Sequence, residues 1–302
     1  MKADLLMLVP LLAEYEERLA THFNLVRAHS RAEQQALLTD NPQRFTVLVT
    51  NGGEGVDRQL MAGLPDLKLI AVNGVGVDKI DKAHASARGI RIATTDNILT
   101  DAVADQAVAL LLALLRQVCE ADRFVRDGLW LKGGFSPLGT SLRGQRVGIL
   151  GLGKIGSAIA ERLQPFGVTL AYHNRRPVTD CPYTYHDDLV ALAQSSDILI
   201  VAAAGGPASQ HLVDEPVLDA LGPLGVIVNV ARGNVINETQ LVARLVDGRL
   251  AGAALDVFEH EPKVPEALFS LRNVVLQPHS GSATLQTRRA MAECVVQAVL
   301  SL

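Results

Sequence analysis

The sequence predicts an α/β protein with two parallel-sheet domains, and three observations support this prediction. Short apolar runs alternate with segments of helical periodicity along the whole chain, which is typical of parallel sheets covered by helices. A Gly-x-Gly-x-x-Gly motif, Gly151–Gly156, lies between one such run and a helical segment. The chain has 302 residues, 48% hydrophobic and 20% charged, which is enough for two domains with buried cores.

Composition and charge argue against several classes of protein. The net charge of −4 gives no reason to expect nucleic acid as a partner. The apolar residues 5–9 end at a proline and predict a strand rather than a signal peptide, and the apolar run 107–115 is too short to span a bilayer. The three cysteines lack metal-site spacing; they are Cys119, Cys181 and Cys294. We therefore expect a cytoplasmic protein with reduced thiols, without a metal and without membrane contact.

The amino-terminal part predicts a five-stranded domain. Its strands are expected at 5–9, 23–28, 46–50, 67–72 and 90–93, and its helices at 11–21, 32–38 and 79–88. The last helical segment, 284–300, follows the final strand of the chain and has no domain of its own. We therefore expect a discontinuous domain made of 1–98 and 284–302, with 99–283 inserted as the second domain.

The middle of the chain predicts one long helix from about Asp101 to Arg126, with Thr100 as its N-cap. Its wide apolar face suggests that both domains pack against it. An irregular stretch, 129–143, follows this helix. A loop of that length is more often functional, or an interaction arm, than a spacer.

The second domain is expected to open with a dinucleotide-binding unit, formed by a strand at 146–150, the glycine motif, a helix and a strand at 168–173. Gly151 permits a tight turn, Gly153 lets the backbone approach a pyrophosphate, and Gly156 allows close packing of the helix. The helix N-terminus then attracts the phosphates. A glycine turn without a ligand is the alternative. Further strands are expected at 198–202, 226–230, 251–255 and 274–276.

The three residues that follow the strand at 168–173 predict which cofactor binds. A site that prefers NAD places an acid there to bind the ribose hydroxyls, but this chain has Asn174, Arg175 and Arg176. The asparagine removes the negative charge, and the two guanidinium groups match a phosphate. The sequence therefore favours NADP(H), the alternative being an ordinary basic surface turn.

Polar residues that follow strands of the second domain are candidates for catalysis. Arg232, Glu261 and His279 are expected at one edge of the sheet, because the carboxyl ends of parallel strands face the ligand. Histidine is suited to protonate an alkoxide, a carboxylate orients it, and arginine binds a substrate carboxylate. Taken singly, the arginine could be a turn residue, the histidine structural and the glutamate an exposed acid, with Glu259 as its competitor.

Four motifs, in order, resemble those of the D-isomer-specific 2-hydroxyacid dehydrogenases; they are Gly151–Gly156, Asn229–Gly233, Leu255–Pro262 and Pro278–Thr284. The resemblance covers nearly the whole chain. It implies that Arg232, Glu261 and His279 form the catalytic triad, with Glu261 rather than Glu259 paired to the histidine. It also implies that Asp256 helps to hold the nicotinamide carboxamide. The other cofactor contacts that we expect in these motifs are Lys154, Ile155, Val230, Ala231, His279 and Gly281.

The resemblance extends to the first domain, where Asn73–Asp78 looks like the family's substrate loop. It implies that the N–H groups of Val75 and Gly76 receive the substrate carboxylate, together with Arg232. A simple strand-to-helix turn is the alternative. The first domain is then flavodoxin-like, the second Rossmann-like, and the substrate and cofactor meet in a cleft between them, which residues 50–53 also line.

Within the family, the arginine pair and the 129–143 arm look most like NADPH-dependent glyoxylate/hydroxypyruvate reductases and the related hydroxyphenylpyruvate reductases. The arm implies a homodimer in which Phe135 or Trp130 approaches the partner's active site, although either aromatic fits a core equally well. Residues 202–207 depart from the family pattern because they lack its usual hydroxyl. Two other functions remain open, a phosphoglycerate dehydrogenase using Arg58 or Lys79, and a non-enzymatic dinucleotide-sensing scaffold.

Overall fold

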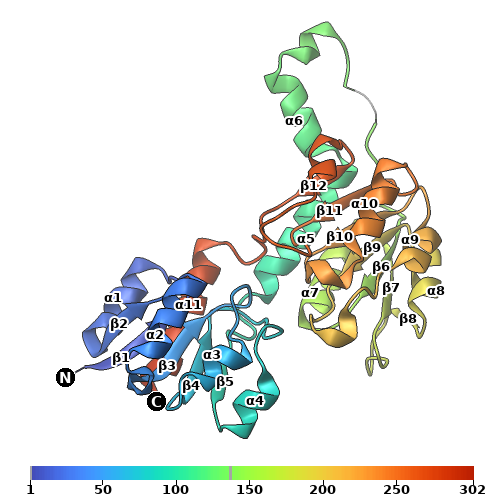
Figure 1. Ribbon diagram of the computed structural model, residues 1–302. Coiled ribbons are helices and arrows are strands. Elements are labelled where there is room, and N and C mark those ends of the chain that lie inside the picture. The colour runs from blue at the N-terminus through green and yellow to red at the C-terminus, as the bar shows by residue number, and fades with distance from the viewer. Residues whose placement is uncertain (1, 136–137) are drawn as a thin grey trace. The chain divides into compact units, whose positions relative to one another are not determined.

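The computed structural model describes residues 2–135 and 138–302 and consists of two compact units (Figure 1). The first unit is made of Met1–Leu99 and Ser282–Leu302, and the second of Thr100–Gly281. The carboxyl-terminal helix thus belongs to the amino-terminal unit. Each unit has its own parallel sheet, with five strands in one and seven in the other. The predicted fold class is confirmed.

The sheet of the first unit has the strand order β2-β1-β3-β4-β5, which is the order of flavodoxin-like folds. Its strands are β1 (Ala3–Met7), β2 (Phe23–Arg27), β3 (Phe45–Thr50), β4 (Leu69–Val72) and β5 (Arg91–Ala93). Its helices are α1 (Ala13–His22), α2 (Arg31–Thr39), α3 (Arg58–Ala62), α4 (Lys82–Ala87) and α11 (Leu285–Leu300). The short α3 is absent from the sequence prediction, and Pro42–Arg44 form a 3-10 turn.

Two apolar layers cover the five-stranded sheet. One face packs against α11, where Val295, Val296 and Val299 lie against buried strand residues such as Met7 and Val47. The other face packs against α3, with Leu60 and Met61 buried over the sheet. Because alternate residues of each strand face opposite sides, nearly every residue of β3 and β4 is apolar and buried.

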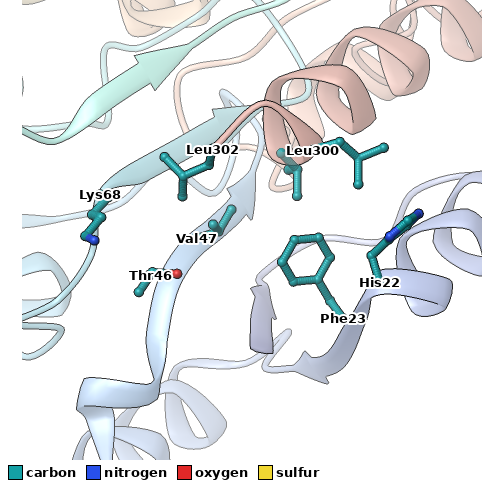
Figure 2. A pocket seen from close by; sticks show the side chains of 8 residues that line it. His22, Phe23, Thr46, Val47, Lys68, Leu300 and Leu302 are labelled. Carbon is teal, nitrogen blue, oxygen red and sulfur yellow. The ribbon is translucent and has the colours of Figure 1, made fainter. Parts of the chain in front are cut away.

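A pocket of about 420 Å³ lies in the first unit, near the starts of β2 and β3 and the end of α11 (Figure 2). It is lined by His22, Phe23, Thr46, Val47, Lys68, Val299, Leu300 and Leu302. Ligands of open parallel sheets bind beyond the carboxyl ends of the strands. This pocket is at the amino ends, so it is not the site that the sequence predicts.

The sheet of the second unit has the order β12-β11-β10-β9-β6-β7-β8. Renumbered from its first strand, this is the Rossmann order 3-2-1-4-5-6 with one more strand at the edge. The strands are β6 (Arg146–Leu150), β7 (Thr169–His173), β8 (Thr184–His186), β9 (Ile198–Val201), β10 (Val226–Asn229), β11 (Gly252–Leu255) and β12 (Val274–Leu276). The short β8 is absent from the sequence prediction.

The helices of the second unit are α5 (Thr100–Leu115), α6 (Val118–Arg126), α7 (Lys154–Leu163), α8 (Leu189–Gln194), α9 (Glu215–Leu221) and α10 (Glu238–Val246). Short 3-10 turns span Leu129–Lys132, Gln164–Phe166, Pro207–Ser209, Gly233–Val235 and Glu266–Ser270. Many of the unit's buried apolar side chains come from α8, α9, α10 and the strands beneath them.

The prediction of one helix from Asp101 to Arg126 is wrong, because the structure has two helices, α5 and α6, bent by 59° at the break. Gln117 has left-handed backbone angles, with φ of 53°. The returning chain occupies the end of α5, where the Thr140 N–H donates to the Leu115 carbonyl at 2.8 Å. Thr100 is the first residue of α5 rather than a residue before it. Figure 1 shows α6 extending away from the seven-stranded sheet.

No single helix of the described residues is both long and apolar enough to cross a membrane. The bent pair of α5 and α6 meets the criterion by length and composition only. Seven side chains of α5 are buried within the protein.

Candidate active site

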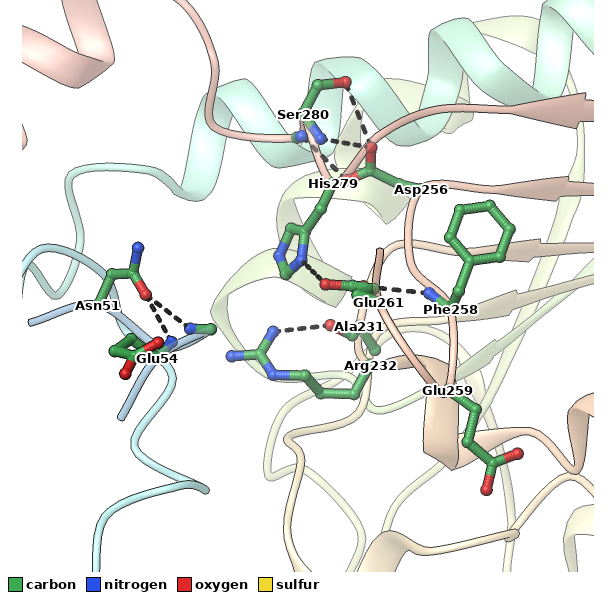
Figure 3. Close-up of polar contacts among 12 residues, drawn as sticks. Asn51, Glu54, Ala231, Arg232, Asp256, Phe258, Glu259, Glu261, His279 and Ser280 are labelled. Carbon is green, nitrogen blue, oxygen red and sulfur yellow. Dashed lines mark hydrogen bonds and ion pairs between the residues drawn. The ribbon is translucent and has the colours of Figure 1, made fainter. Parts of the chain in front are cut away.

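The loops that follow three neighbouring strands of the second unit carry the residues predicted to be catalytic. Arg232 follows β10, Asp256 follows β11 directly, and His279 follows β12. Glu261 lies in the longer loop between β11 and β12. All four side chains therefore belong to the carboxyl edge of one parallel sheet (Figure 3).

Glu261 and His279 form a hydrogen-bonded pair, with 2.8 Å between Glu261 Oε2 and His279 Nδ1. The other carboxylate oxygen, Oε1, accepts the Phe258 N–H at 3.0 Å. Since an ionised carboxylate only accepts hydrogen bonds, Nδ1 carries a proton in this arrangement. The pair thus fixes the orientation of the ring and leaves Nε2 for a substrate.

The electrostatic surroundings keep Glu261 ionised. Burial raises the pKa of this carboxyl group, but the hydrogen bond and charge of His279, the Phe258 N–H and the charge of Arg232 together hold the pKa below its usual range. The His279 side chain is 42% exposed. Solvent and a small molecule can therefore reach the imidazole ring.

A buried asparagine holds the turn that bears Arg232. Asn229, only 1% exposed, donates through Nδ2 to the Arg232 carbonyl at 3.0 Å and accepts the Ala231 N–H at 3.0 Å through Oδ1. The arginine Nη1 donates to the Ala231 carbonyl at 2.8 Å. The turn after β10 is therefore fixed by a side chain at the end of the strand itself.

Asp256 fixes the loop that bears His279. Its carboxylate is 2% exposed, and it accepts the N–H groups of Ser280 at 2.7 Å and Gly281 at 2.9 Å. Its backbone carbonyl accepts the His279 N–H at 2.8 Å. Burial raises the pKa of Asp256 against the effect of these hydrogen bonds. The expected contact of Asp256 with a nicotinamide carboxamide stays a prediction.

The competing acid, Glu259, has a different partner. Its Oε1 lies 2.9 Å from His211 Nε2, and Figure 3 shows its side chain pointing away from His279. Its N–H donates to Glu238 Oε2 at 3.0 Å. Sequence reasoning overlooked Glu238 and His211, because an acid in the first turn of a helix ordinarily indicates only a favourable helix dipole.

The glycine loop between β6 and α7 has the shape that a dinucleotide requires. Gly151 has φ of 97°, and a Cβ there would lie 2.6 Å from Ala203 backbone atoms. A Cβ on Gly156 would lie 2.1 Å from the Gly151 carbonyl oxygen, so α7 packs as close as a glycine permits. A Cβ on Gly153 meets no atom within 4 Å. The start of α7 therefore has open space above its N–H groups.

Asn174 has a role that the sequence did not predict. Its Oδ1 accepts the Leu152 N–H of the glycine loop at 2.7 Å, and its Nδ2 donates to the Leu152 carbonyl at 3.4 Å. Its own carbonyl accepts the Tyr185 hydroxyl at 3.1 Å. The asparagine thus joins the turn after β7 to the glycine loop, besides leaving that turn without an acid.

The two arginines of this turn are exposed. Among the described residues, Arg175 and Arg176 form no hydrogen bond or ion pair with another side chain. The turn itself is fixed, because the Tyr172 hydroxyl accepts the Val178 N–H at 2.9 Å. Two cations on an anchored turn, beside a glycine loop, are suited to bind a phosphate group.

The predicted substrate loop lies in the first unit, after β4. Its Asn73 N–H donates to the Thr50 carbonyl at 2.7 Å, and the Gly74 carbonyl accepts the Thr95 N–H at 3.0 Å. Within the described chain, the N–H groups of Val75 and Gly76 donate no hydrogen bond. The neighbouring turn is closed by Asn51, whose Oδ1 accepts the Gly53 and Glu54 N–H groups (Figure 3).

The arm, residues 129–143, presents large apolar side chains to solvent. Trp130 is 68% exposed and Leu131 is 95% exposed. Phe135 packs instead against Phe124 of α6, with their rings edge to face at 5.3 Å. The expectation for Ser136 and Pro137 of the arm falls outside the described residues.

The family model for the D-isomer specific 2-hydroxyacid dehydrogenase NAD binding domain matches residues 108–281. The chain is 46% identical to glyoxylate/hydroxypyruvate reductase A of Arabidopsis thaliana, over 96% of the chain and 93% of the relative. It is 44% identical to hydroxyphenylpyruvate reductase of Plectranthus scutellarioides, over 96% and 93%. The structure of an NADPH-dependent glyoxylate/hydroxypyruvate reductase from Sinorhizobium meliloti, in complex with NADP and malonate, matches with a TM-score of 0.92, 43% identity and coverage of 98% and 92%.

Proposed function

Because the chain belongs to the D-isomer-specific 2-hydroxyacid dehydrogenase family, we propose that it reduces small 2-keto acids with NADPH. Glyoxylate, which gives glycolate, and hydroxypyruvate, which gives D-glycerate, are the first candidates. The observation that carries the proposal is the Glu261–His279 pair beside Arg232, at the carboxyl edge of a Rossmann sheet. Bound NADPH supplies a hydride to the keto carbon.

The residues of the second unit account for the proton and for the charge of the substrate. His279, held by Glu261, donates a proton from Nε2 to the carbonyl oxygen as that oxygen becomes an alkoxide. Arg232 binds the substrate carboxylate and polarises the carbonyl. We assign the N–H groups of Val75 and Gly76 to the same carboxylate, which their lack of hydrogen-bond acceptors in the described chain supports.

The preference for NADP(H) rests on the turn after β7. Arg175 and Arg176 would bind the 2′-phosphate, and the start of α7 at Lys154 and Ile155 would bind the pyrophosphate. Asp256 would help to hold the nicotinamide carboxamide, and Val230, Ala231, His279 and Gly281 would be further cofactor contacts. The solved relative with NADP bound supports this cofactor. Because cells generally keep NADP reduced, we propose that the enzyme consumes keto acids rather than producing them.

The test is a substrate panel measured with NADPH and with NADH. We expect NADPH oxidation with glyoxylate and hydroxypyruvate, and much slower oxidation with NADH. An enzyme that uses NADH equally well would contradict the cofactor assignment. If none of the 2-keto acids supported NADPH oxidation, that result would contradict the whole proposal and favour the dinucleotide-sensing scaffold.

A second substrate class has a specific observation in its favour. The relative at 44% identity is named hydroxyphenylpyruvate reductase, so hydroxyphenylpyruvate belongs in the same panel. A phosphoglycerate dehydrogenase activity is less well supported, because Lys79 Nζ already donates to the Gly53 carbonyl at 2.6 Å. Higher kcat/KM for the aromatic acid than for glyoxylate would favour the second class.

We also propose a homodimer formed through the second unit and the arm, in the cytoplasm. The exposed Trp130 and Leu131 support an interface, since large apolar side chains in one segment are usually covered. Three free cysteines fit a reducing compartment. Light scattering should give twice the chain mass, and Trp130→Ala with Leu131→Ala should give the monomer. A wild-type monomer would contradict this proposal, and a tagged protein found outside the cytoplasm would contradict the location.

A further inference from the structure

Glu238 is a buried carboxylate beside the site that the proposed reaction does not use. It is the first residue of α10, follows the N-cap Asn237, and is 9% exposed. Burial raises the pKa of its carboxyl group, which shows that the protein disfavours a charge there. A residue held against this cost needs an explanation beyond an ordinary helix start.

The hydrogen bond of Glu238 explains its place. We call residues 258–261 the strap, because this segment leads from the end of β11 toward His279 and ends at Glu261. Two successive N–H groups of the strap donate to carboxylates. The Phe258 N–H donates to Glu261 Oε1 at 3.0 Å, and the Glu259 N–H donates to Glu238 Oε2 at 3.0 Å. The first bond is internal to the strap. The second ties the strap to α10.

The strap also has little freedom on its other side. A Cβ on Gly233 would lie 1.9 Å from the Phe258 carbonyl carbon and 2.2 Å from the Glu259 nitrogen. The turn after Arg232 is therefore in direct contact with the same peptide whose N–H Glu238 holds. A movement of this peptide would shift Glu261 relative to both Arg232 and His279.

The charges around Glu238 argue against a purely electrostatic role. Glu259 and Glu261 raise its pKa and His260 lowers it, while Glu259 is itself paired with His211. A negative charge here repels Glu261 rather than supporting it. What Glu238 contributes is an acceptor at a fixed place.

We propose that Glu238 is a positioning residue, which holds the strap through the Glu259 N–H and so keeps Glu261 Oε2 within hydrogen-bond distance of His279 Nδ1. This inference rests on the proposed function for its kinetic consequence, but the geometry exists without substrate. Without the bond from α10, the strap relaxes and the Glu261–His279 pair loosens. The charge of His279 holds the pKa of Glu261 low, and this coupling acts in both directions, so a looser pair should narrow the active pH range at its basic end.

The test compares Glu238→Ala, Glu238→Asp and Glu238→Gln in the full-length enzyme. Alanine removes the acceptor, and aspartate keeps the charge but is too short to reach the strap. Glutamine keeps an oxygen acceptor at the same distance. We expect kcat to fall by up to about tenfold in the first two variants, the order of one uncharged hydrogen bond. The KM for NADPH should be unchanged, and the basic limb of the kcat/KM profile should move to lower pH.

Glu238→Gln should recover kcat and the position of the basic limb. The matched control is Glu215→Ala, which removes a carboxylate from the first residue of another helix of the same unit, where its partner is Arg244. We expect the wild-type basic limb in that variant. A basic limb that stays in place in Glu238→Ala and Glu238→Asp, or that moves equally in Glu238→Gln, would overturn the proposal.

A second readout needs no substrate. The proton between His279 Nδ1 and Glu261 should give a downfield imidazole N–H resonance in the NMR spectrum of the wild-type protein, assigned by its loss in His279→Ala. We expect this resonance to broaden in Glu238→Asp and to persist in Glu238→Gln. Its persistence in Glu238→Asp would overturn the proposal, whereas a wild-type enzyme that reduces no keto acid would overturn the proposed function alone.

Discussion

Glu261 uses both carboxylate oxygens, one for the Phe258 N–H at 3.0 Å and one for His279 Nδ1 at 2.8 Å. The substitution Glu261→Gln keeps the size of the side chain but leaves only one acceptor oxygen. Either the strap or the histidine then faces an NH₂ group. The charge-assisted bond to His279 is lost or weakened, at a cost of about 1.5–3 kcal/mol.

This cost gives the expected loss of activity. At about 1.4 kcal/mol per factor of ten, kcat/KM should fall about 10- to 150-fold. The loss should be greatest at high pH, because the charge of His279 holds the pKa of Glu261 low and this coupling acts in both directions. The basic limb should therefore move to lower pH.

The assay is NADPH oxidation with glyoxylate across the pH range, with NADPH binding measured separately by fluorescence. The matched control is Glu259→Gln, which removes the same charge from the same strap, while its glutamine oxygen still accepts from His211. We expect the control to behave as the wild type. Equal losses in the two variants, or a basic limb that does not move in Glu261→Gln, would refute the assignment of Glu261 as the partner of His279.

Three further predictions concern the cofactor, pH and the glycine loop. Alanine at both Arg175 and Arg176 should raise the KM for NADPH at least about tenfold, as expected for lost charge-assisted bonds, and leave the KM for NADH nearly unchanged. Equal changes in the two KM values would contradict the phosphate assignment. Because burial raises the pKa of Glu238 in the folded protein, the folded state loses stability as pH rises through that pKa. Glu238→Gln should therefore raise Tm at pH 8 relative to the wild type and not at pH 4. A rise in Tm at pH 4 and none at pH 8 would contradict this prediction. Gly156→Ala places a Cβ 2.1 Å from the Gly151 oxygen, at a cost of about 1–3 kcal/mol, so Tm and NADPH affinity should both fall. The control Gly134→Ala, where an added Cβ meets no atom within 4 Å, should change neither. Equal Tm values in the two variants would contradict the packing argument.

Local signals in the sequence were sufficient for the centre of the second unit. The strand at 146–150 agrees with the structure residue for residue, because a short apolar run, a glycine turn and a helix start all lie within one continuous segment. The same holds for the strand at 274–276. Strand and helix order, and hence the fold class, follow from this alternation.

Long-range contacts account for what the sequence did not predict. At the bend near Gln117, the Thr140 N–H donates to the Leu115 carbonyl at the end of α5, and no pattern near residue 117 indicates this contact. The choice between Glu259 and Glu261 depends on Glu238 and His211, which lie 21 and 48 residues away from Glu259. Residues alone left that choice open, and only the family resemblance favoured Glu261.

Asn174 shows the same limit in another form. The sequence shows that the residue after β7 carries no charge. The hydrogen bonds of its side chain to Leu152 form only when β6 and β7 pair, so the sequence does not show them. An asparagine can donate and accept at once, whereas the acid it replaces can only accept.

The central claim is that His279 delivers the proton in an NADPH-dependent reduction of 2-keto acids. The most direct measurement compares glyoxylate-dependent NADPH oxidation by the wild type and by His279→Ala, with NADPH binding measured on both. We expect turnover to fall about 10²- to 10⁴-fold, as for the loss of a general acid, with binding unchanged. Wild-type turnover in His279→Ala would contradict the account.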